Sequence, residues 1–407
     1  MSHYAADLAE LLARDQGLPG RCFLDEDFLE LERHHVFESA WTCVALSADI
    51  PSHGSLFPLT LLGQPLLLSR DTEAVQAFHN VCSHRGAVLV DTPLRGRPRI
   101  VCPYHGWTYR LDGTLAATPH VGGPDRHACE SLDPCRLSLR KVSCAEWAGH
   151  IFVNLSGAAP PFADWISSTA KRLGDLDWSE LRRDASLAAA PEVRANWKIV
   201  VENFVESYHL PWVHHELNSV NPMSRHYQIL GGHAYLGQGG TAYEAERIVG
   251  SGLPLRKGGD ARRYEALFVF PNLILAPLAD MAFSILLLPE TAAITRERLE
   301  FWFVGDEALG EAHRIARETS AAFIARVNAE DIGIVERVQR GRRSQAFSGG
   351  QFSHPQEASS LQFQKMVASW LLAAGERAPQ SIVELPTADV AYPPATSSAL
   401  GSQVPAS

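Results

Sequence analysis

Two short clips of cysteine and histidine constrain this chain more than any other feature of its sequence. The first reads NVCSHRG and separates Cys82 from His84 by one residue, and the second reads IVCPYHG and separates Cys102 from His105 by two. Two thiolates and two imidazoles on paired tight loops can bind zinc or a [2Fe–2S] cluster. The fold must therefore bring these two loops together.

The spacing and the glycines that follow each clip favour a cluster over zinc. Gly86 and Gly106 have no Cβ, which lets backbone N–H groups approach the sulfur atoms. Zinc modules usually separate their first two ligands by two to four residues, so the first clip is unusual for them. The pattern is that of a Rieske centre, in which the two cysteines hold one iron and the two histidines hold the other. A structural zinc site remains the alternative.

A second group of histidines and carboxylates lies in VENFVESYHLPWVHHEL, residues 201–217. On a helix, Glu206 and His209 would share one face, whereas His214 would point about 140° away from His209. Pro211 should kink or end the helix, so that His214 can turn back toward His209. Two imidazoles and one carboxylate with open positions form the facial triad of mononuclear iron(II) oxygenases.

Two other interpretations of this segment stay open. The histidines can be structural, and E-x-x-H also occurs at Glu32 and His35, as in di-iron helical bundles. The β-rich middle of the chain does not supply the four-helix core that a di-iron site needs. His215 follows His214 directly and is expected at the surface.

The remaining pattern predicts an α+β fold. Helical spacing at 4–14 and 25–38 is followed over 42–155 by short β-like runs between Gly, Pro and Asp turns. Beyond them, helical patterns alternate with apolar strands: helices at 163–184, 196–218, 306–338 and 355–375. We expect N-terminal helices over 1–41, a small all-β domain over 42–156, a mixed domain over 157–380 and a flexible tail over 381–407.

Composition excludes several classes of function. A formal net charge of −10 argues against a nucleic-acid surface, which needs clustered Lys and Arg. No apolar run is long enough to span a membrane, and the amphipathic, acidic start of the chain does not resemble a secretion signal. The seven cysteines are therefore expected to be reduced. These features predict a cytoplasmic protein that binds neither nucleic acid nor membrane.

Together, the two constellations make residues 20–375 resemble the catalytic α subunit of the Rieske non-haem iron oxygenases. The resemblance implies an all-β Rieske [2Fe–2S] domain and a catalytic domain whose curved antiparallel sheet is flanked by helices, with the N-terminal helices packing on it. It places two iron ligands on His209 and His214, and the third on Asp331 in NAEDIGIVERVQRG. Glu330 and Glu336 are the alternatives for that third ligand.

Glu206 falls on a carboxylate position that, in this family, links two metal centres of neighbouring subunits. The link joins a Rieske histidine, His105 here, to an iron-ligating histidine, His209 here. Most members of the family have Asp at this position, whereas this chain has Glu. The resemblance therefore assigns Glu206 to electron transfer rather than to iron binding.

Within the family, the chain is most similar to glycine betaine, carnitine and choline monooxygenases and to N-demethylases. This resemblance implies a homotrimeric terminal oxygenase that hydroxylates or N-demethylates a quaternary or methylated amine with O2, Fe(II) and the cluster. Electrons would come from NAD(P)H through a separate reductase or ferredoxin, because the chain has no G-x-G-x-x-G motif of its own. Aromatic candidates for the substrate pocket are Phe204, Tyr208, Tyr264, Phe268, Phe283 and Trp302.

Three other functions remain open. The first two belong to the same family: an aromatic-acid hydroxylase or dioxygenase, and an O-demethylase. The third is a Rieske electron carrier without oxygenase activity, which would leave nearly 250 residues unexplained. The segment around Asp331 separates this third function from the others, because an electron carrier has no need for a second metal site.

Overall fold

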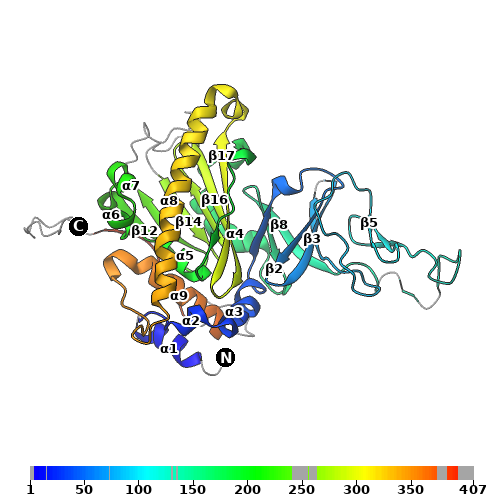
Figure 1. Ribbon diagram of the computed structural model, residues 1–407, viewed down its shortest axis with the longest axis horizontal. Helices are drawn as coiled ribbons and strands as arrows, with labels where there is room; N and C mark the ends of the chain where they lie inside the picture. Colours follow the sequence, from blue (N-terminus) through cyan, green and yellow to red (C-terminus); the bar gives the residue numbers. More distant parts are fainter. Residues whose placement is uncertain are drawn as a thin grey trace, which may run out of the picture.

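The computed structural model of the chain has two β-sheet domains side by side (Figure 1). It describes residues 4–14, 16–72, 74–129, 132–133, 136–240, 255, 264–373 and 383–392. Within these residues, no helix has both the length and the apolar character needed to cross a bilayer. The α+β class predicted from the sequence is confirmed, with antiparallel pairing throughout both large sheets.

The smaller domain is built from a six-stranded and a three-stranded antiparallel sheet. The larger of these sheets has the order β1-β9-β8-β4-β3-β2, with strands at Thr42–Leu46, His150–Asn154, Lys141–Trp147, Ala74–His79, Gln64–Asp71 and Leu56–Leu61. The smaller sheet contains β5 (Ile100–Val101), β6 (Thr108–Tyr109) and β7 (Leu115–Ala117). It lies at the end of the molecule farthest from the second domain (Figure 1).

The second domain is built on a nine-stranded antiparallel sheet. Its main path runs β10-β17-β16-β15-β14-β13-β12-β18, and β11 pairs with β17. In chain order, the strands are Leu181–Arg183 (β10), Glu192–Val193 (β11), His226–Gly231 (β12), Tyr235–Gly240 (β13), Tyr264–Val269 (β14), Leu273–Pro277 (β15), Met281–Thr291 (β16), Ile294–Val304 (β17) and Thr387–Ala391 (β18).

Both faces of this sheet are buried, which explains its long apolar runs. In β14, Leu267 and Val269 join a core with residues of the first domain, whereas Phe268 and the following Phe270 join a core with the helices. Consecutive side chains of a strand point to opposite faces, so a strand covered on both sides has apolar residues pointing both ways. The sheet is thus the common wall between the two layers.

Three helices cover one face of the sheet: α5 (Trp197–Phe204), α8 (Arg314–Gly341) and α9 (His354–Leu372). Figure 1 shows the long α8 crossing in front of the strands, with α5 beside it. The N-terminal helices α1 (Ala5–Arg14), α2 (Arg21–Leu24) and α3 (Glu26–Glu32) pack into the same core. There, Lys198 of α5 pairs with Glu32 at 2.7 Å, and both side chains are fully buried.

The helices expected over 163–184 and 306–338 have different bounds in the structure. The helix expected over 163–184 stops at Arg172 as α4 (Phe162–Arg172), and the chain then enters a short turn and β10. Asp177 caps that turn by accepting a hydrogen bond from the backbone N–H of Ser179, which draws the backbone out of the helix. The helix expected from 306 begins at Arg314, after two short 3₁₀ turns.

The expectation of a flexible tail over 381–407 is wrong for its middle part. Residues 387–391 form β18, which adds to the edge of the sheet by pairing with β12. Arg172 holds this strand through an ion pair with Asp389 at 3.0 Å. Beyond it, the Tyr392 hydroxyl lies 2.7 Å from Ser207 Oγ and 3.3 Å from the Ser207 backbone N. The last 15 residues, 393–407, lie outside the described part.

Replacing Tyr392 with phenylalanine should lower the free energy of unfolding by about 1 kcal/mol, because Ser207 would lose its hydrogen-bond partner. Urea denaturation measures this change. The same substitution at Tyr104, which is half exposed, serves as the control and should change stability by less than about 0.5 kcal/mol. Equal stability of the Tyr392→Phe variant and the parent would show that β18 does not hold this loop.

The two domains meet at a buried histidine. His150 of β9 lies 2.9 Å from Ser284 Oγ of β16 through Nε2, and its Nδ1 lies 2.6 Å from the Ala148 carbonyl. Burial lowers the pKa of His150 to about 4. The ring is therefore neutral at pH 7, with Nδ1 donating to the carbonyl and Nε2 accepting from the serine hydroxyl.

This histidine should make the protein sensitive to acid. Because the pKa is lower in the folded state than its ordinary value of 6.5, the unfolded chain binds a proton that the folded chain does not. The free energy of unfolding should fall as the pH drops from about 6.5 to about 4, by at most about 1.4 kcal/mol per pH unit. Urea titrations at several pH values measure the slope, which should be smaller in His150→Gln. An unchanged slope in that variant would contradict the assignment.

Candidate active site

The two cysteine–histidine clips form a matched pair of turns. In the first, the Cys82 N–H donates to the Ala87 carbonyl and the Gly86 N–H to the Cys82 carbonyl, at 2.8 and 3.0 Å. In the second, the Cys102 N–H donates to Trp107 and the Gly106 N–H to Cys102, at 2.8 and 3.1 Å. Both glycines have a positive φ, 75° and 69°, which glycine adopts without strain. The repeat in sequence is thus a repeat in structure.

The four side chains of these clips divide into an inner and an outer pair. Cys82 and Cys102 are buried, whereas His84 and His105 are exposed, with ring centroids 4.7 Å apart. A single zinc ion would need all four donor atoms around one point. These four do not form a set of donors within 4.8 Å of one another, in contrast to the second site. Separate thiolate and imidazole pairs fit the two irons of a Rieske cluster.

A tyrosine approaches one of the two buried thiols. The Tyr109 hydroxyl lies 3.2 Å from Cys82 Sγ and 2.9 Å from Ser83 Oγ. Burial raises the pKa of Tyr109, so its hydroxyl keeps its proton at neutral pH. Hydrogen bonds to sulfur are among the factors that set the potential of a cluster.

The second constellation lies where helix α5 ends. The helix stops at Phe204, so Glu206 and His209 lie on a loop rather than on one helical face as expected. Pro211 is in the first turn of the short helix α6 (Leu210–Val213), a position that suits proline because no N–H partner is lost there. The proline therefore starts a new helix instead of kinking an old one.

This break brings together the three residues predicted as iron ligands. Asp331 Oδ1 lies 2.9 Å from His214 Nε2 and 3.4 Å from His209 Nε2. In the described part of the chain, no other set of three His, Cys, Asp or Glu donors lies within 4.8 Å. Burial acts to lower the pKa of His209, but Glu206 and Asp331 outweigh it and raise this pKa. Negative charge thus converges where a cation would bind.

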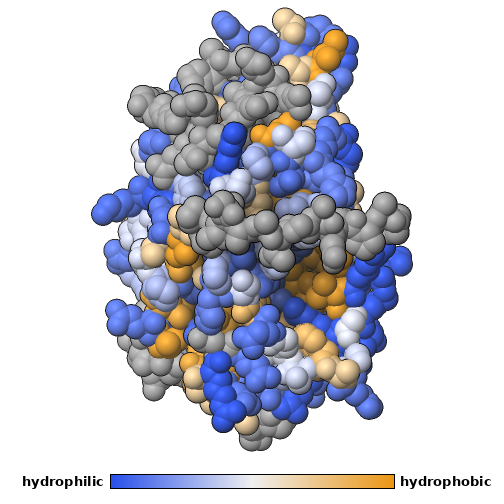
Figure 2. Space-filling view, turned by 90° about the vertical axis from the view of Figure 1, so that its left-hand side faces the viewer, coloured by the Kyte–Doolittle hydropathy of each residue, from blue (hydrophilic) through white to orange (hydrophobic). Residues whose placement is uncertain are grey.

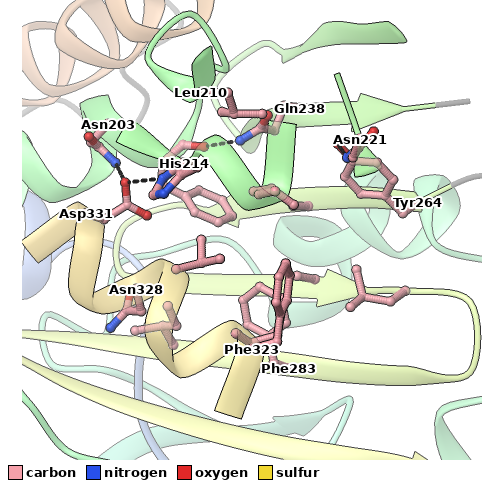
Figure 3. Close-up of a pocket in the computed structure, with 18 of the residues that line it drawn as sticks. Asn203, Leu210, His214, Asn221, Gln238, Tyr264, Phe283, Phe323, Asn328 and Asp331 are labelled. Carbon is pink, nitrogen blue, oxygen red and sulfur yellow. Dashed lines mark hydrogen bonds and ion pairs between the residues drawn. The ribbon is translucent and has the colours of Figure 1, made fainter. Parts of the chain in front are cut away.

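Each donor is oriented by a further polar group. Glu206 Oε1 lies 2.5 Å from His209 Nδ1, and Glu330 Oε2 lies 2.7 Å from His214 Nδ1. Asn203 donates to Asp331 Oδ1 at 2.6 Å (Figure 3). A carboxylate on Nδ1 fixes the ring so that Nε2 faces the metal position, as is common around metal-binding histidines. Glu330 therefore contacts the ring nitrogen of His214 that faces away from Asp331.

The other residues considered for a metal site have separate places. Glu336 accepts a hydrogen bond from the Arg194 backbone N–H at 3.1 Å, and His215 is exposed at the start of α7 (His215–Val220). Glu32 is committed to the buried ion pair with Lys198. A di-iron site at Glu32 is therefore excluded, and the surface position expected for His215 is observed.

A cavity of about 120 Å³ lies beside the three converging donors, between α8 and the sheet (Figure 3). Of the six aromatic candidates, Phe204, Tyr264 and Phe283 line it. The other three do not. Phe268 is fully buried against Phe363. Trp302 lies beside a second, smaller cavity, with its ring centroid 5.2 Å from that of His150. Tyr208 is 47% exposed.

Several residues of the cavity wall were not found from the sequence, among them Asn203, Asn221, His226, Gln238, Phe323 and Asn328. Two of them could have been recognised in the sequence, because His226 and Gln238 are polar residues within strands that are mostly buried. Polar side chains inside a sandwiched sheet need partners, and such positions often face a site.

The face of the molecule that looks away from the smaller domain carries α6 and α7 (Figure 1). It is mostly hydrophilic, but apolar residues gather in a recessed patch at mid-height (Figure 2). Trp212 of α6 is 69% exposed. An exposed aromatic side chain of this size is typical of a surface that contacts another molecule.

One domain carries the paired cysteines and histidines of a cluster, and the other carries three converging donors beside a cavity. This combination defines an iron-dependent oxygenase that has its own centre for accepting electrons. Two family models match this division. Residues 40–132 match the Rieske [2Fe-2S] domain, and residues 177–373 match the ring hydroxylating alpha subunit (catalytic domain). The chain belongs to the Rieske non-haem iron oxygenases, as an α subunit. The family uses a [2Fe–2S] cluster, a mononuclear iron, O2 and electrons from a separate reductase.

Relatives with named substrates cover much of the chain. It is 28% identical to the carnitine monooxygenase oxygenase subunit of Escherichia coli K12, over 82% of this chain and 86% of that protein. It is 32% identical to the glycine betaine monooxygenase oxygenase subunit of Chromohalobacter salexigens, over 52% and 46% of the two chains.

Solved structures share the fold. A quaternary ammonium Rieske monooxygenase superposes with a TM-score of 0.75 at 23% identity, covering 89% of this chain and 98% of the other. A naphthalene 1,2-dioxygenase superposes with a TM-score of 0.70 at 19% identity, covering 88% and 92%. Because enzymes with such different substrates share this architecture, the fold alone does not select a substrate.

Proposed function

We propose that this α subunit is the terminal oxygenase that hydroxylates an N-methyl carbon of a quaternary or methylated amine. The observation that carries the proposal is the position of His209, His214 and Asp331 at one end of a cavity with aromatic walls. The names of the carnitine and glycine betaine relatives support this class of substrate. A hydroxylated N-methyl group would break down to formaldehyde and the demethylated amine.

The cavity wall suits a methylated cation. Phe204, Tyr264, Phe283 and Phe323 all line the cavity. Aromatic faces attract a quaternary ammonium group through the negative potential above the ring, by up to about 2 kcal/mol where water is excluded. The net charge of −10 also favours the approach of cations over anions.

The triad would hold Fe(II) through His209 Nε2, His214 Nε2 and an oxygen of Asp331. When bound, iron supplies O2 activation at its open coordination positions. Glu330 keeps the His214 ring oriented by accepting a hydrogen bond from Nδ1–H, and Asn203 orients Asp331 by donating one to Oδ1. Apolar side chains around the cavity exclude water from the reacting carbon. Insertion of one oxygen atom into a C–H bond consumes two electrons and two protons and releases one water.

Electrons would enter through the pair of exposed histidines, His84 and His105. Glu206 would couple this pair to the iron site, which is supported by the contact of one of its carboxylate oxygens with His209 Nδ1. We propose that His105 of one protomer approaches Glu206 of its neighbour in a homotrimer. Exposed aromatic side chains near both positions, Tyr104 at 56% and Trp212 at 69%, support such contacts.

A separate NAD(P)H-dependent reductase or ferredoxin would be the electron donor, and we propose a cytoplasmic location for the pair. Cys22, Cys43 and Cys144 form no disulfide, which suits a reducing compartment.

Substrate-dependent O2 uptake tests the proposed function. The purified α subunit, reconstituted with iron and a reductase, is offered carnitine, glycine betaine, choline and tertiary methylamines, with aromatic acids as the comparison. We expect a methylated amine to stimulate O2 uptake and to release one formaldehyde per O2. Stimulation by aromatic acids alone, without formaldehyde, would assign the enzyme to ring hydroxylation instead.

A further inference from the structure

The loop that carries Glu206 and His209 is held by one glutamine side chain from the sheet. Helix α5 ends at Phe204, so the last carbonyls of the helix have no helical partner. Gln238 Nε2 donates to the Phe204 carbonyl at 2.9 Å and to the Glu206 carbonyl at 3.2 Å. A single amide group of β13 thus spans both ends of the turn before His209.

These two hydrogen bonds use both N–H groups of the amide, and the amide oxygen of Gln238, Oε1, can only accept. It lies 3.1 Å from His226 Nδ1. His226 is buried, and its contacts are with the neutral Gln238, Tyr264 and Asn221. Burial lowers the pKa of His226 to about 4, so the ring carries one N–H at neutral pH. Nδ1 faces the Gln238 acceptor, and Nε2 lies 3.2 Å from the Asn221 backbone carbonyl, so an acceptor is available to a hydrogen on either nitrogen.

The remaining ring nitrogen extends the chain of hydrogen bonds toward the cavity. The Tyr264 hydroxyl lies 3.1 Å from His226 Nε2. Asn221 Nδ2 in turn donates to the Tyr264 oxygen at 2.8 Å. The four side chains form one connected chain from Asn221 to the carbonyls of Phe204 and Glu206.

All four members of this chain line the cavity. In Figure 3, Asn221 and Tyr264 lie at the end away from His214 and Asp331, and Gln238 lies between. Asn221 Oδ1 is buried and has no hydrogen-bond partner among the residues described. The polar wall that a bound substrate would touch is therefore continuous with the support of the 205–209 loop.

We propose that Gln238 is a positioning residue that couples occupancy of the cavity to the placement of Glu206. A substrate that contacts Tyr264 or Asn221 shifts a chain whose far end fixes the Phe204 and Glu206 carbonyls. The inference rests on the proposed role of Glu206 in electron transfer. A displacement of about 1 Å at such a group can slow a reaction by about 100-fold, so a small shift is enough.

Gln238→Leu tests the proposal, because it removes both donors without adding charge. Gln362→Leu is the matched control. Gln362 Nε2 also donates to two backbone carbonyls, those of Gly232 and Pro386, at 2.9 and 3.1 Å, and it does not line the cavity. Both variants are prepared as full-length protein with iron and cluster, and the iron content and cluster spectrum are measured first.

The first readout is the rate at which O2 reoxidises the reduced cluster in a single turnover with a methylated amine. Gln238→Leu should slow this rate by about 10- to 100-fold, raise the O2 consumed per formaldehyde and retain its iron, whereas Gln362→Leu should stay within about twofold of the parent. A parental rate and coupling in Gln238→Leu, or loss of its iron, would overturn the proposal.

The second readout does not depend on turnover. Hydrogen exchange of the amides at 207–210 should accelerate by about tenfold in Gln238→Leu and remain unchanged in Gln362→Leu. Unchanged exchange in both variants would also overturn the proposal. If Gln238→Leu fails to fold, Gln238→Glu replaces it, since it keeps the acceptor for His226 and loses both donors. If aromatic acids and not amines drive reoxidation, the proposed function fails, while the effect of Gln238 is still measured with those acids.

Discussion

Asp331→Ala should retain the absorbance spectrum of the cluster and lose substrate-dependent O2 uptake by more than about 100-fold. Asp331 Oδ1 is the atom to which both His209 Nε2 and His214 Nε2 point. Without it, two imidazoles remain, which is too few ligands to retain Fe(II). Changes to groups that only orient a ligand cost 10- to 100-fold, so loss of a ligand itself should cost more. Iron analysis should show that the iron of the second site is missing.

The control for this variant lies on the same helix. Glu318 of α8 is exposed and pairs with Arg314, far from the triad in sequence, so Glu318→Ala removes a carboxylate without touching the cavity. Its iron content and O2 uptake should match the parent. Full activity in Asp331→Ala would show that the third ligand is another group and would reopen the choice of Glu330.

Glu206→Gln should reduce turnover by about 10- to 100-fold while both metal centres stay loaded. The glutamine can still accept the hydrogen bond from His209 Nδ1, which the carboxylate now contacts at 2.5 Å. The substitution removes the negative charge that would link the cluster to the iron site. The effect should therefore appear in the reoxidation rate of the reduced cluster, measured by stopped-flow absorbance, and not in the binding constant for substrate.

Glu206→Asp keeps the negative charge and shortens the side chain by one methylene, so it distinguishes the effect of charge from that of side-chain length. Asp is the residue that most members of the family have here, so this variant should recover most of the rate if the carboxylate is what matters. Glu216, exposed on α7 and paired with Arg326, provides the neutral comparison through Glu216→Gln. A Glu206→Gln variant that reoxidises its cluster at the parental rate would refute the assignment.

The local features of the site could be read from the sequence because they depend on short stretches of backbone. The two clips predict two tight turns, and glycines with positive φ close both of them. Pro211 predicts a break between His209 and His214, and the break is there, although the proline begins α6 instead of kinking α5. Spacing and turn chemistry act over a few residues, so no knowledge of the distant chain is required.

The lining of the cavity could not be read in the same way. Both faces of the large sheet are buried, so apolar residues occupy both faces of its central strands and the alternation that would mark one face is lost. Phe283 faces the cavity whereas Phe268 is sealed in the core, and nothing in their local sequence distinguishes them. The tail could not be predicted from its local sequence either. Residues 387–391 form β18 because they pair with the edge of β12, which lies far away in the sequence.

The sequence by itself identified the candidate ligands of the cluster and the two histidines of the proposed triad, because each pair lies within a few residues of its partner. It left Glu330 open beside Asp331 as the third ligand, and only the tertiary structure shows which of the two carboxylates faces both imidazole rings. Glu330 and Asp331 are neighbours on α8, and the packing of that helix against α5 and α6 turns one toward both imidazole Nε2 atoms and the other behind His214. Successive residues on a helix point about 100° apart, so the orientation of the whole helix selects between them.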